Sequence, residues 1–527
     1  MGNCLPICAS ETDVSKKSKS VPIDTTFKLP SPIPSWPPVA GDGFASGIID
    51  LGGLQVCQIS SFNKVWATHE GGPDDLGVTF FEPSQIPQGF LMLGCYSQPN
   101  NRALFGWVLV GKDDSSTTTN GALKEPIDYT LVWSSESSKM KQDGNGYVWL
   151  PTAPDGYKAV GHVVTTTPEK PSLERIRCVR SDLTDQCEID SWIWGPEKTS
   201  NESKFNVFNA RPNNRGTQAP GVQVGTFVAQ NGGTNSPLSI ACLKNTKSLL
   251  SSMPNLTQID ALVQAYSPLV YLHPDEEYHP SSLNWYFTNG ALLYKKGEEA
   301  KPVPIDTTGS NLPQGGSNDG SYWVDLPVDK ANKERVKKGD LQSSQAYMHI
   351  KPMLGATFTD IAIWIFYPYN GPARAKVQLI NIPLGEWLEA SELEFQNGNK
   401  PVAYSSLHGH ALYPKPGLVL QGNGGIGIRN DTAKSTKVLD TGVRFEVVAG
   451  EYLGSAINEP AWLNYLRKWG PRIDYSINDE IEKIEKLLPG KLKAAFEKFV
   501  NGLPDEILGE EGPTGPKVKN NWSGDEL

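Results

Sequence analysis

Residues 62–66 read Phe-Asn-Lys-Val-Trp, and a matching pattern returns 67 positions later as Tyr-Thr-Leu-Val-Trp at residues 129–133. A second pair has the same displacement: residues 87–94, Pro-Gln-Gly-Phe-Leu-Met-Leu-Gly, correspond to residues 154–161, Pro-Asp-Gly-Tyr-Lys-Ala-Val-Gly. Anchors that recur in one order at a constant displacement indicate an internal repeat, and a repeat constrains the architecture before any single motif does.

The repeat has further anchors. Phe81-Glu-Pro83 corresponds to Trp149-Leu-Pro151, and a third, degenerate copy runs through Trp192, Trp194 and residues 220–225. Each unit contains short alternating segments bounded by proline and glycine, which is typical of strand–turn–strand structure. We therefore expect two or three tandem β-sandwich-like units.

The composition agrees with a β-rich chain of several domains. A chain of 527 residues is too long for one core, and its 51 glycines and 41 prolines favour many short strands joined by turns. We predict a flexible, lipidated tail over residues 1–40, a repeat domain over 41–245 and a C-terminal domain over 246–527. The expected fold class is mainly β, with the repeat units followed by a β-sandwich-like domain that has short C-terminal helices.

Apolar stripes locate the expected helices. Leu256, Ile259 and Val263 share one face of a predicted helix that Pro268 ends. Three more stripes near the C-terminus predict helices at residues 460–469, 481–488 and 492–499. The glycine-rich stretch 422–427 resembles a phosphate loop, but the alternation of apolar residues after it favours a hairpin turn.

Bulk properties exclude several classes of protein. The formal net charge of −10 argues against nucleic acid as a partner, because phosphate binding needs a basic surface. The seven cysteines include no Cys-x-x-Cys pair and indicate neither a disulfide framework nor a zinc site. No apolar run approaches the roughly 18 residues that span a bilayer. We therefore expect a cytoplasmic protein with reduced thiols and no transmembrane span.

The N-terminus has the form of a lipid anchor. Met-Gly-Asn-Cys places a myristoylation start at Gly2, with Cys4 and Cys8 as palmitoylation sites. One acyl chain binds a bilayer only marginally, so a second lipid or a basic patch is required, and lysines at residues 16–19 supply the latter. Pro6 stands where the motif prefers Ser or Thr, so the alternative is an unmodified tail. An acylated chain would be peripheral on the plasma membrane or on endomembranes.

Long phrases after the repeats resemble one family. Residues 266–280 read Tyr-Ser-Pro-Leu-Val-Tyr-Leu-His-Pro-Asp-Glu-Glu-Tyr-His-Pro, which resembles a signature of the plant vacuolar protein sorting-associated protein sixty-two-like family. Four other stretches resemble the same family: residues 369–375, 390–395, 406–411 and 512–516. The resemblance covers nearly the whole chain. It implies a role in delivering proteins to the vacuole, an association by family rather than by chemistry.

The resemblance also implies a gap in this chain. Relatives carry a further segment after the equivalent of Gly385, with a Gly-Asp-Trp-Glu-His motif and a Ser-x-His motif on adjacent strands. Here Gly385 runs directly into Glu386-Trp-Leu388. A skipped exon or an annotation error would explain the junction, and the lost segment would have formed central strands of the C-terminal sheet.

Histidines and acids in the C-terminal half are candidate metal ligands. His408 and His410 lie two apart, so on a strand both would face the same side. With Asp275, Glu276 or Glu277 they offer nitrogen and oxygen ligands for a divalent cation. Our candidate set is His408, His410, Asp275 and Glu277, and it is incomplete if the missing segment supplied further ligands. The alternative is that these residues lie in surface turns beside prolines.

The leading interpretation is a non-enzymatic peripheral membrane or adaptor protein that acts in protein trafficking to the vacuole. It implies no catalytic residues and no cofactor, with a membrane surface or trafficking proteins as partners. The competing class is a divalent-metal-dependent glycan- or lipid-binding protein, or a hydrolase that uses the metal.

Overall fold

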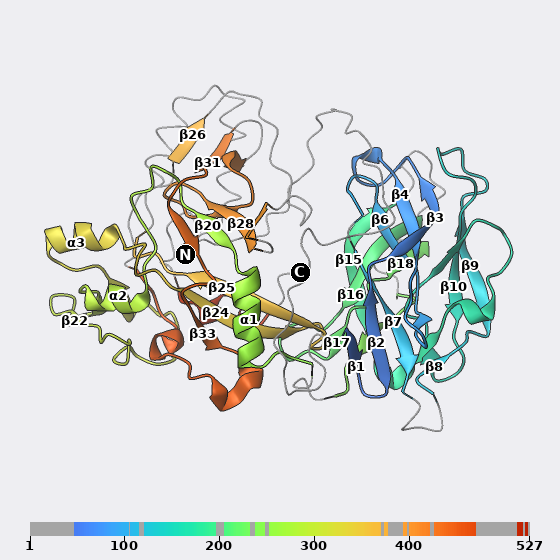
Figure 1. Cartoon of the computed structure of the whole chain (residues 1–527), viewed down its shortest axis with the longest axis horizontal. Coiled ribbons are helices and arrows are strands. Elements are labelled where there is room, and N and C mark those ends of the chain that lie inside the picture. The colour runs from blue at the N-terminus through green and yellow to red at the C-terminus, as the bar shows by residue number, and fades with distance from the viewer. Residues whose placement is uncertain are drawn as a thin grey trace.

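Strands dominate the structure, and helices are few and short (Figure 1). The computed structural model describes residues 47–104, 106–114, 121–195, 205–231, 238–247, 252–369, 374–377, 394–397, 400–421, 426–470, 514–519 and 522–524. Most strand pairs are antiparallel, which confirms the mainly β fold of tandem units followed by a further β-rich part.

The first half consists of three copies of a six-stranded unit. The strands of the first copy are β2 (Leu54–Ile59), β3 (Phe62–Thr68), β4 (Val78–Pro83), β5 (Leu91–Met92), β6 (Tyr96–Pro99) and β7 (Val108–Asp113). The second copy has β8 (Leu123–Lys124), β9 (Asp128–Ser134), β10 (Tyr147–Thr152), β11 (Tyr157–Lys158), β12 (Val163–Thr165) and β13 (Cys178–Arg180). The third copy has β14 (Thr184–Asp185), β15 (Cys187–Trp194), β16 (Phe205–Pro212), β17 (Gly221–Val222), β18 (Phe227–Asn231) and β19 (Cys242–Lys244).

The three units share one topology. In each, the second, third and fifth strands form one antiparallel sheet, and the first, sixth and fourth form another. Strand β1 (Ile48–Asp50) extends the second sheet of the first unit by pairing with β2. The degenerate third copy is therefore a complete unit.

The units also share an irregularity. A register shift interrupts the pairing of the second strand with the third immediately before Trp66, Trp133 and Trp194. Such β-bulges twist a strand and re-aim its side chains. The common bulge turns the three indoles toward one another. The distance between ring centroids is 5.8 Å for Trp66 and Trp133, 5.4 Å for Trp133 and Trp194, and 6.3 Å for Trp66 and Trp194.

The Pro-x-Gly-aromatic element makes the same turn in the first two units. Gly89 and Gly156 have φ angles of +84° and +79°, a conformation that glycine adopts without steric cost. In both turns the N–H of the following aromatic residue donates to the proline carbonyl at 3.0 Å. The equal contexts of Gly89 and Gly156 meet the structural expectation for a 67-residue repeat.

The three units close into a ring. Strand β12 of the second unit contacts β3 of the first, β18 of the third contacts β9 of the second, and β6 of the first contacts β15 of the third. Buried residues of all three units form one cluster around the tryptophans and a second around Leu54, Val179 and Leu243. The units are therefore not independent sandwiches on a string, because each completes its core with residues of the next.

Gly94 and Gly161 lie where the three units approach one another most closely, and neither position has room for a side chain. A Cβ atom on Gly161 would lie 2.8 Å from the Cα atom of Gly94, and one on Gly94 would lie 2.6 Å from Cγ2 of Thr226. The backbone N–H of Cys95 donates to the carbonyl of His162 at 2.9 Å across this contact. Glycine is needed here for close backbone approach rather than for a special φ angle.

The second half is built around two sheets and one helix. One sheet contains β27 (Phe395–Gln396), β28 (Lys400–Ser405), β20 (Leu269–Tyr271), β32 (Val438–Asp440) and β29 (Leu412–Tyr413). Another contains β25 (Phe358–Ile365), β24 (Ala346–Met353) and β33 (Phe445–Ala449). Smaller sheets contain β21 (Leu292–Lys295), β22 (Val303–Pro304) and β23 (Tyr322–Asp325), and β26 (Arg374–Val377), β30 (Gly417–Gln421) and β31 (Ile426–Thr432). Within the described residues, this half also contains the short helices α2 (Leu283–Thr288) and α3 (Lys330–Lys337).

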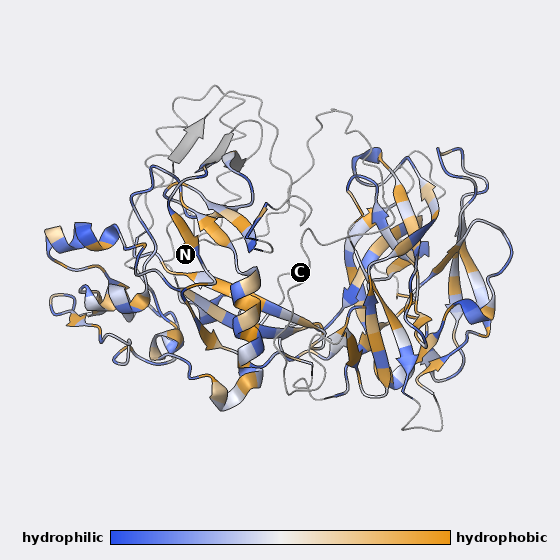
Figure 2. Ribbon diagram, viewed as in Figure 1, coloured by the Kyte–Doolittle hydropathy of each residue, from blue (hydrophilic) through white to orange (hydrophobic). Residues whose placement is uncertain are grey.

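The predicted helix before Pro268 is confirmed as α1 (Leu256–Tyr266). Asn255 caps its first turn through a reciprocal bond with Gln258, and Ile259 and Val263 pack on the β24 sheet. Apolar residues concentrate on this helix and along the strands (Figure 2). Strands β30 and β31 pair as the hairpin predicted around the glycine-rich stretch, whose residues 422–425 lie outside the described part of the chain.

The predicted helix over residues 460–469 is wrong. Only one 3-10 turn forms, at Ala461–Asn464, and Tyr465 after it has an extended backbone. Lys468 instead makes β-bridges to Trp323 and Thr514, which hold the segment against neighbouring chain. Its apolar stripe is nevertheless buried, because Trp462, Leu463, Tyr465 and Trp469 all lie in one hydrophobic core. The stripes predicted at 481–488 and 492–499 lie outside the described residues.

The two halves touch at the tip of the β24–β25 hairpin, which reaches toward β17 (Figure 1). Asn245 is buried there, and its side-chain amide donates to the carbonyl of Gly355 at 2.6 Å. Trp107 lies with its ring centroid 5.2 Å from that of Phe358. Near the C-terminus, Ser523 accepts a backbone hydrogen bond from Thr217 at 3.1 Å.

Candidate functional site

Three segments of the C-terminal half meet at a buried carboxylate. One is the turn that follows β20, one is the loop over residues 406–411 that joins β28 to β29, and one is the chain just after β25. The loop is closed by hydrogen bonds from the backbone N–H of Ser406 to the carbonyl of Ala411 and from His410 back to Ser406, at 2.8 Å and 3.0 Å. Its ends are fixed because Ser405 pairs with Leu412.

His408 and His410 lie within this loop rather than on a strand. Their φ angles are +64° and +56°, in the left-handed region that few residues other than glycine adopt. Two residues with such φ angles in a loop of six residues lower the stability of the fold. Backbone strain of this kind concentrates at functional or tightly constrained positions. The strand geometry supposed for the pair is therefore wrong, although both rings still reach one group.

That group is the carboxylate of Glu276, whose side chain is almost completely buried. The backbone N–H of His408 donates to Oε2 at 2.6 Å, and the backbone N–H of Tyr278 donates to Oε1 at 2.8 Å. His408 Nδ1 lies 3.5 Å from Oε1, and His410 Nε2 lies 3.5 Å from Oε2. Each carboxylate oxygen thus faces one backbone donor and one imidazole nitrogen.

The electrostatics of the cluster favour a charged Glu276 and a neutral His410. Burial alone would raise the pKa of Glu276, but interactions with His410 and the N–H groups of His408 and Tyr278 outweigh it and hold the pKa at about 2. Burial lowers the pKa of His410, and the nearby carboxylate offsets this only in part. A carboxylate held ionised beside buried imidazoles can accept hydrogen bonds or bind a cation.

Aromatic rings cover the cluster. Tyr367 is buried and stacks on His410, with ring centroids 3.8 Å apart and an interplanar angle of 13°. Burial raises the pKa of Tyr367 well above its usual range, so the phenol stays neutral. On the other side Tyr278 lies between His408 and Tyr369, with centroid distances of 5.5 Å and 4.9 Å. The rings fix the imidazoles and limit water access to the carboxylate.

The predicted ligand set is only partly assembled. His408 and His410 come together, but Asp275 is exposed and has His273 Nδ1 as its neighbour at 3.9 Å, and Glu277 is also exposed. The residue between them, Glu276, occupies the site. In the described part of the chain, no group of three or more His, Cys, Asp or Glu side chains has an arrangement suited to a metal ion.

The predicted lipid anchor and the predicted junction cannot be placed in the structure. Gly2, Cys4 and Cys8 lie outside the described residues, and so does the junction at Gly385. No helix in the described ranges is long and apolar enough to cross a membrane.

Comparisons with known proteins give one extensive match. The family model described as vacuolar protein sorting-associated protein 62 matches residues 23–386 and 384–526. A solved structure, the crystal structure of GNIP1Aa from Chromobacterium piscinae, is similar over 41% of this chain and 40% of that chain, with 21% identity and a TM-score of 0.31. This chain thus corresponds to about two fifths of that protein's length. A search of curated proteins found no match.

Proposed function

Because the chain belongs to the family of vacuolar protein sorting-associated protein 62, we propose that it is a non-enzymatic adaptor, peripheral on a cytoplasmic membrane face, that helps deliver proteins to the vacuole. The family relationship concerns vacuolar sorting in general. The adaptor role, the membrane and the direction of transport are the proposal.

The observation that supports an adaptor is the outer surface of the three-unit ring. Two residues before the central tryptophan of each unit stand Lys64, Leu131 and Trp192, and all three are exposed. Leu131 and Trp192 are large apolar side chains with 45% and 43% of their surface accessible. The same exposed position thus carries a different side chain in each of the three units of a rigid ring. Such an arrangement can present several contact residues to a protein partner, and tryptophan is enriched at protein–protein contacts.

A double substitution of these residues tests the adaptor role. In cells that lack the endogenous protein, the wild-type chain should restore delivery of a vacuolar hydrolase, whereas Leu131→Asp/Trp192→Asp should leave a larger share of it in the medium. A charge on the contact surface adds a desolvation cost to any apolar contact made there. The measurement is the ratio of secreted to intracellular hydrolase.

Val303→Asp is the matched control, because Val303 is 53% exposed but lies in the other half. Equal sorting by the double variant and the wild type, with normal protein levels, would exclude this surface. Normal sorting in cells without the protein would exclude the function itself.

Membrane attachment through the N-terminus gives a second prediction. Gly2→Ala should move the protein from the membrane fraction to the supernatant, because without myristate the lysines at 16–19 bind anionic lipid weakly. Fractionation of cells expressing each form is the measurement, and Cys4→Ser/Cys8→Ser separates the contribution of a second acyl chain. Equal membrane fractions for Gly2→Ala and the wild type would rule out the anchor, the outcome to expect if Pro6 blocks acylation.

The buried carboxylate keeps a second class under consideration, a divalent-metal-dependent binder of glycans or lipids or a hydrolase. Glu276 with His408 and His410 provides two nitrogen donors and one oxygen donor within 3.5 Å contacts. A metal would have to compete with the backbone N–H groups that already occupy the Glu276 oxygens. The two matched stretches of the family model meet at residues 384–386, the position at which we expect a segment to be missing.

We therefore predict weak metal binding by this chain. Isothermal titration with zinc, manganese and calcium should give affinities no better than those of an exposed histidine pair, because backbone N–H groups already occupy the Glu276 oxygens and the three side chains are not arranged as a metal site. His408→Ala/His410→Ala should remove whatever weak binding these two imidazoles provide. Tight, stoichiometric binding that disappears in the double variant would instead favour the metal-dependent class.

A further inference from the structure

One long strand of the second half has an unpaired edge. Strand β25 pairs with β24 along all eight of its residues, and no described strand pairs with its other side (Figure 1). Within the described chain, the backbone groups of β25 make no hydrogen bond outside this pairing with β24. Nothing in the proposed adaptor role uses this edge.

The direction of the backbone groups on β25 follows from its neighbour. The N–H of Ala346 in β24 donates to the carbonyl of Arg444 at 3.0 Å, so it points toward β33 and away from β25. In an antiparallel pair, successive residues point their N–H and C=O groups alternately toward the partner strand and away from it. Pro352, which has no N–H, lies opposite Thr359 at a position where this alternation needs no bond. The residues of β25 whose N–H and C=O groups point outward are therefore Thr359, Ile361, Ile363 and Ile365.

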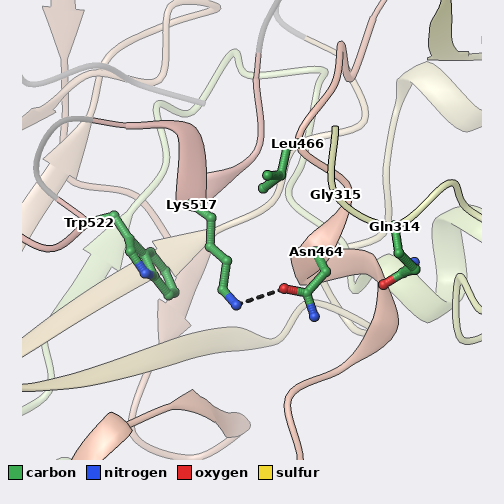
Figure 3. A pocket seen from close by; sticks show the side chains of 6 residues that line it. All are labelled: Gln314, Gly315, Asn464, Leu466, Lys517 and Trp522. Carbon is green, nitrogen blue, oxygen red and sulfur yellow. Dashed lines mark hydrogen bonds between the residues drawn. The ribbon is translucent and has the colours of Figure 1, made fainter. Parts of the chain in front are cut away.

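Both faces of this sheet are covered, so the opening is at its edge. Ile259 and Val263 of α1 pack on one face of β24. On the other face Trp522 stacks on His349, with ring centroids 3.9 Å apart. Figure 3 shows Trp522 beside Lys517 at the wall of a cavity that no residue of β25 lines. All eight residues of β24 are buried, whereas all eight residues of β25 are half-buried, which is the pattern that an unpaired edge produces.

Strand β25 lacks the features that keep edge strands from pairing. Natural edge strands are short or bulged, or they carry lysine or proline. The sequence of β25 is Phe-Thr-Asp-Ile-Ala-Ile-Trp-Ile, in unbroken register with β24. Its one charged residue, Asp360, already forms an ion pair with the buried Lys351 at 2.7 Å. β-branched and aromatic residues on both faces are typical of a strand inside a sheet. The composition of β25 is therefore that of a central strand, although it lies at an edge.

The free edge is complementary to a second copy of itself. Two β25 strands can pair antiparallel about a two-fold axis that passes beside Ala362. In this register each outward residue faces an outward residue of the other copy, so all of their N–H and C=O groups find partners. The hydrogen-bonded pairs are Thr359 with Ile365 and Ile361 with Ile363.

The side chains fit the same register. Ala362 faces its own equivalent in a pair without hydrogen bonds, where the Cα atoms are only about 4.5 Å apart and a small side chain is favoured. Asp360 lies opposite Trp364 of the other copy, so no like charges meet across the contact. An edge that is nearly neutral, apolar and symmetric about a small residue fits a second copy of this chain.

We propose that β25 pairs with β25 of a second copy and so joins the two three-stranded sheets into one continuous sheet across a two-fold axis. A contact made mainly by two strands is small beside the roughly 1,200–2,000 Å² buried in stable complexes. The dimer should therefore be weak, with a Kd on the order of 10 µM. The proposal goes beyond the adaptor role and does not depend on it.

The test uses the full chain and two variants of opposite charge. Sedimentation velocity from about 1 µM to about 200 µM, which brackets the expected Kd, should show the wild-type chain passing from monomer to dimer. Ala362→Glu and Ala362→Lys should each weaken dimerisation about tenfold, because each places two like charges opposite one another at the two-fold axis. An equimolar mixture of the two variants should dimerise again, since a negative and a positive side chain then face each other.

Ala331→Glu is the matched control, because Ala331 is exposed on α3 of the same half and should dimerise as the wild type does. Thermal unfolding verifies that each variant is folded. A wild-type chain that stays monomeric at all concentrations would overturn the proposal and leave the edge to some other extended peptide. Dimers of wild-type affinity in both charged variants would place the contact elsewhere. Loss of dimers that the mixture does not restore would contradict the register about Ala362, and assembly beyond the dimer would contradict the two-fold axis.

Discussion

Replacing Gly161 with valine is expected to destabilise the whole three-unit ring by about 3 kcal/mol, at the upper end of the cost of overpacking. Any Cβ atom at this position lies 2.8 Å from the Cα atom of Gly94 and 2.8 Å from the carbonyl oxygen of Leu93. Both neighbours are backbone, so no side chain can rotate aside. The units must move apart, which weakens the packing of the shared tryptophan cluster. Denaturant unfolding followed by tryptophan fluorescence is the measurement.

Gly156→Ala provides the comparison within the same unit. A Cβ atom at Gly156 meets nothing within 4 Å, so the substitution costs only the left-handed φ angle of +79°, about 1 kcal/mol. Gly161→Val should therefore have the larger effect. It should lower the denaturant midpoint of one cooperative transition of the whole ring, and no separate transition of a single unit should appear. Stability of Gly161→Val within 0.5 kcal/mol of the wild type would contradict close contact at the centre of the ring.

Glu276→Gln is expected to lower the free energy of unfolding by about 3 kcal/mol. The buried carboxylate accepts two backbone hydrogen bonds, whereas the glutamine amide has only one oxygen that can accept and replaces the other with a donor nitrogen. The amide nitrogen of glutamine must face the N–H of either His408 or Tyr278, which now bond to Oε2 and Oε1. The loop over residues 406–411 should loosen, which faster proteolysis or amide exchange there would reveal. Glu277→Gln changes an exposed carboxylate next to it and should be nearly neutral.

The same site predicts how stability depends on pH. The pKa of Glu276 in the fold is about 2, below its ordinary value of 4.5, so its contribution is complete above about pH 4.5 and is lost as the pH falls toward 2. This difference corresponds to about 3 kcal/mol. Burial also lowers the pKa of His410 below 6.5, so protonation of the unfolded chain favours unfolding as soon as the pH falls below 6.5.

Denaturation midpoints measured from pH 7 to pH 3 should therefore decline in two stages in the wild type. In Glu276→Gln the stage below pH 4.5 should shrink, because the titrating carboxylate is gone. The groups near Glu276 on the packed elements include His279, His408, His410, Tyr367 and Lys437, and Tyr367 stays neutral throughout. Burial lowers the pKa of His279 as well, so it contributes to the stage that begins below pH 6.5. If the denaturation midpoint of the variant falls below pH 4.5 as steeply as that of the wild type, other carboxylates control acid unfolding.

The repeat could be predicted because its strongest signals are local. A bulge before each tryptophan and a proline–glycine turn are properties of short segments, so they recur in the sequence wherever the unit recurs. The third copy has a weaker sequence signal, because in residues 220–225 the two glycines are four rather than five positions apart and the Pro-x-Gly-aromatic order is absent. Closure of the ring could not be predicted, since contacts such as β6 with β15 join segments with no shared pattern.

The histidines of the candidate site could be predicted from the sequence, but the acid that they contact could not. His408 and His410 meet at one carboxylate, but in a loop with positive φ angles rather than on the strand that their spacing suggested. Which of three consecutive acids turns inward depends on the phase of a turn, and Asp275, Glu276 and Glu277 look alike in sequence. Pro274 and Pro280 flank this turn without fixing that phase. The helix expected at residues 460–469 failed because an apolar stripe records burial and not backbone conformation.

The circular closure of the three units has a consequence for synthesis of the protein on the ribosome. The first unit needs β15 of the third to cover β6, and Leu51 near the start accepts a backbone hydrogen bond from Thr246 at 2.9 Å. At translation speeds of about 5–20 residues per second, the first unit waits on the order of ten seconds for its partner. During that interval the nascent chain exposes an apolar seam, which makes this part of the protein a natural client for chaperones that bind emerging polypeptides.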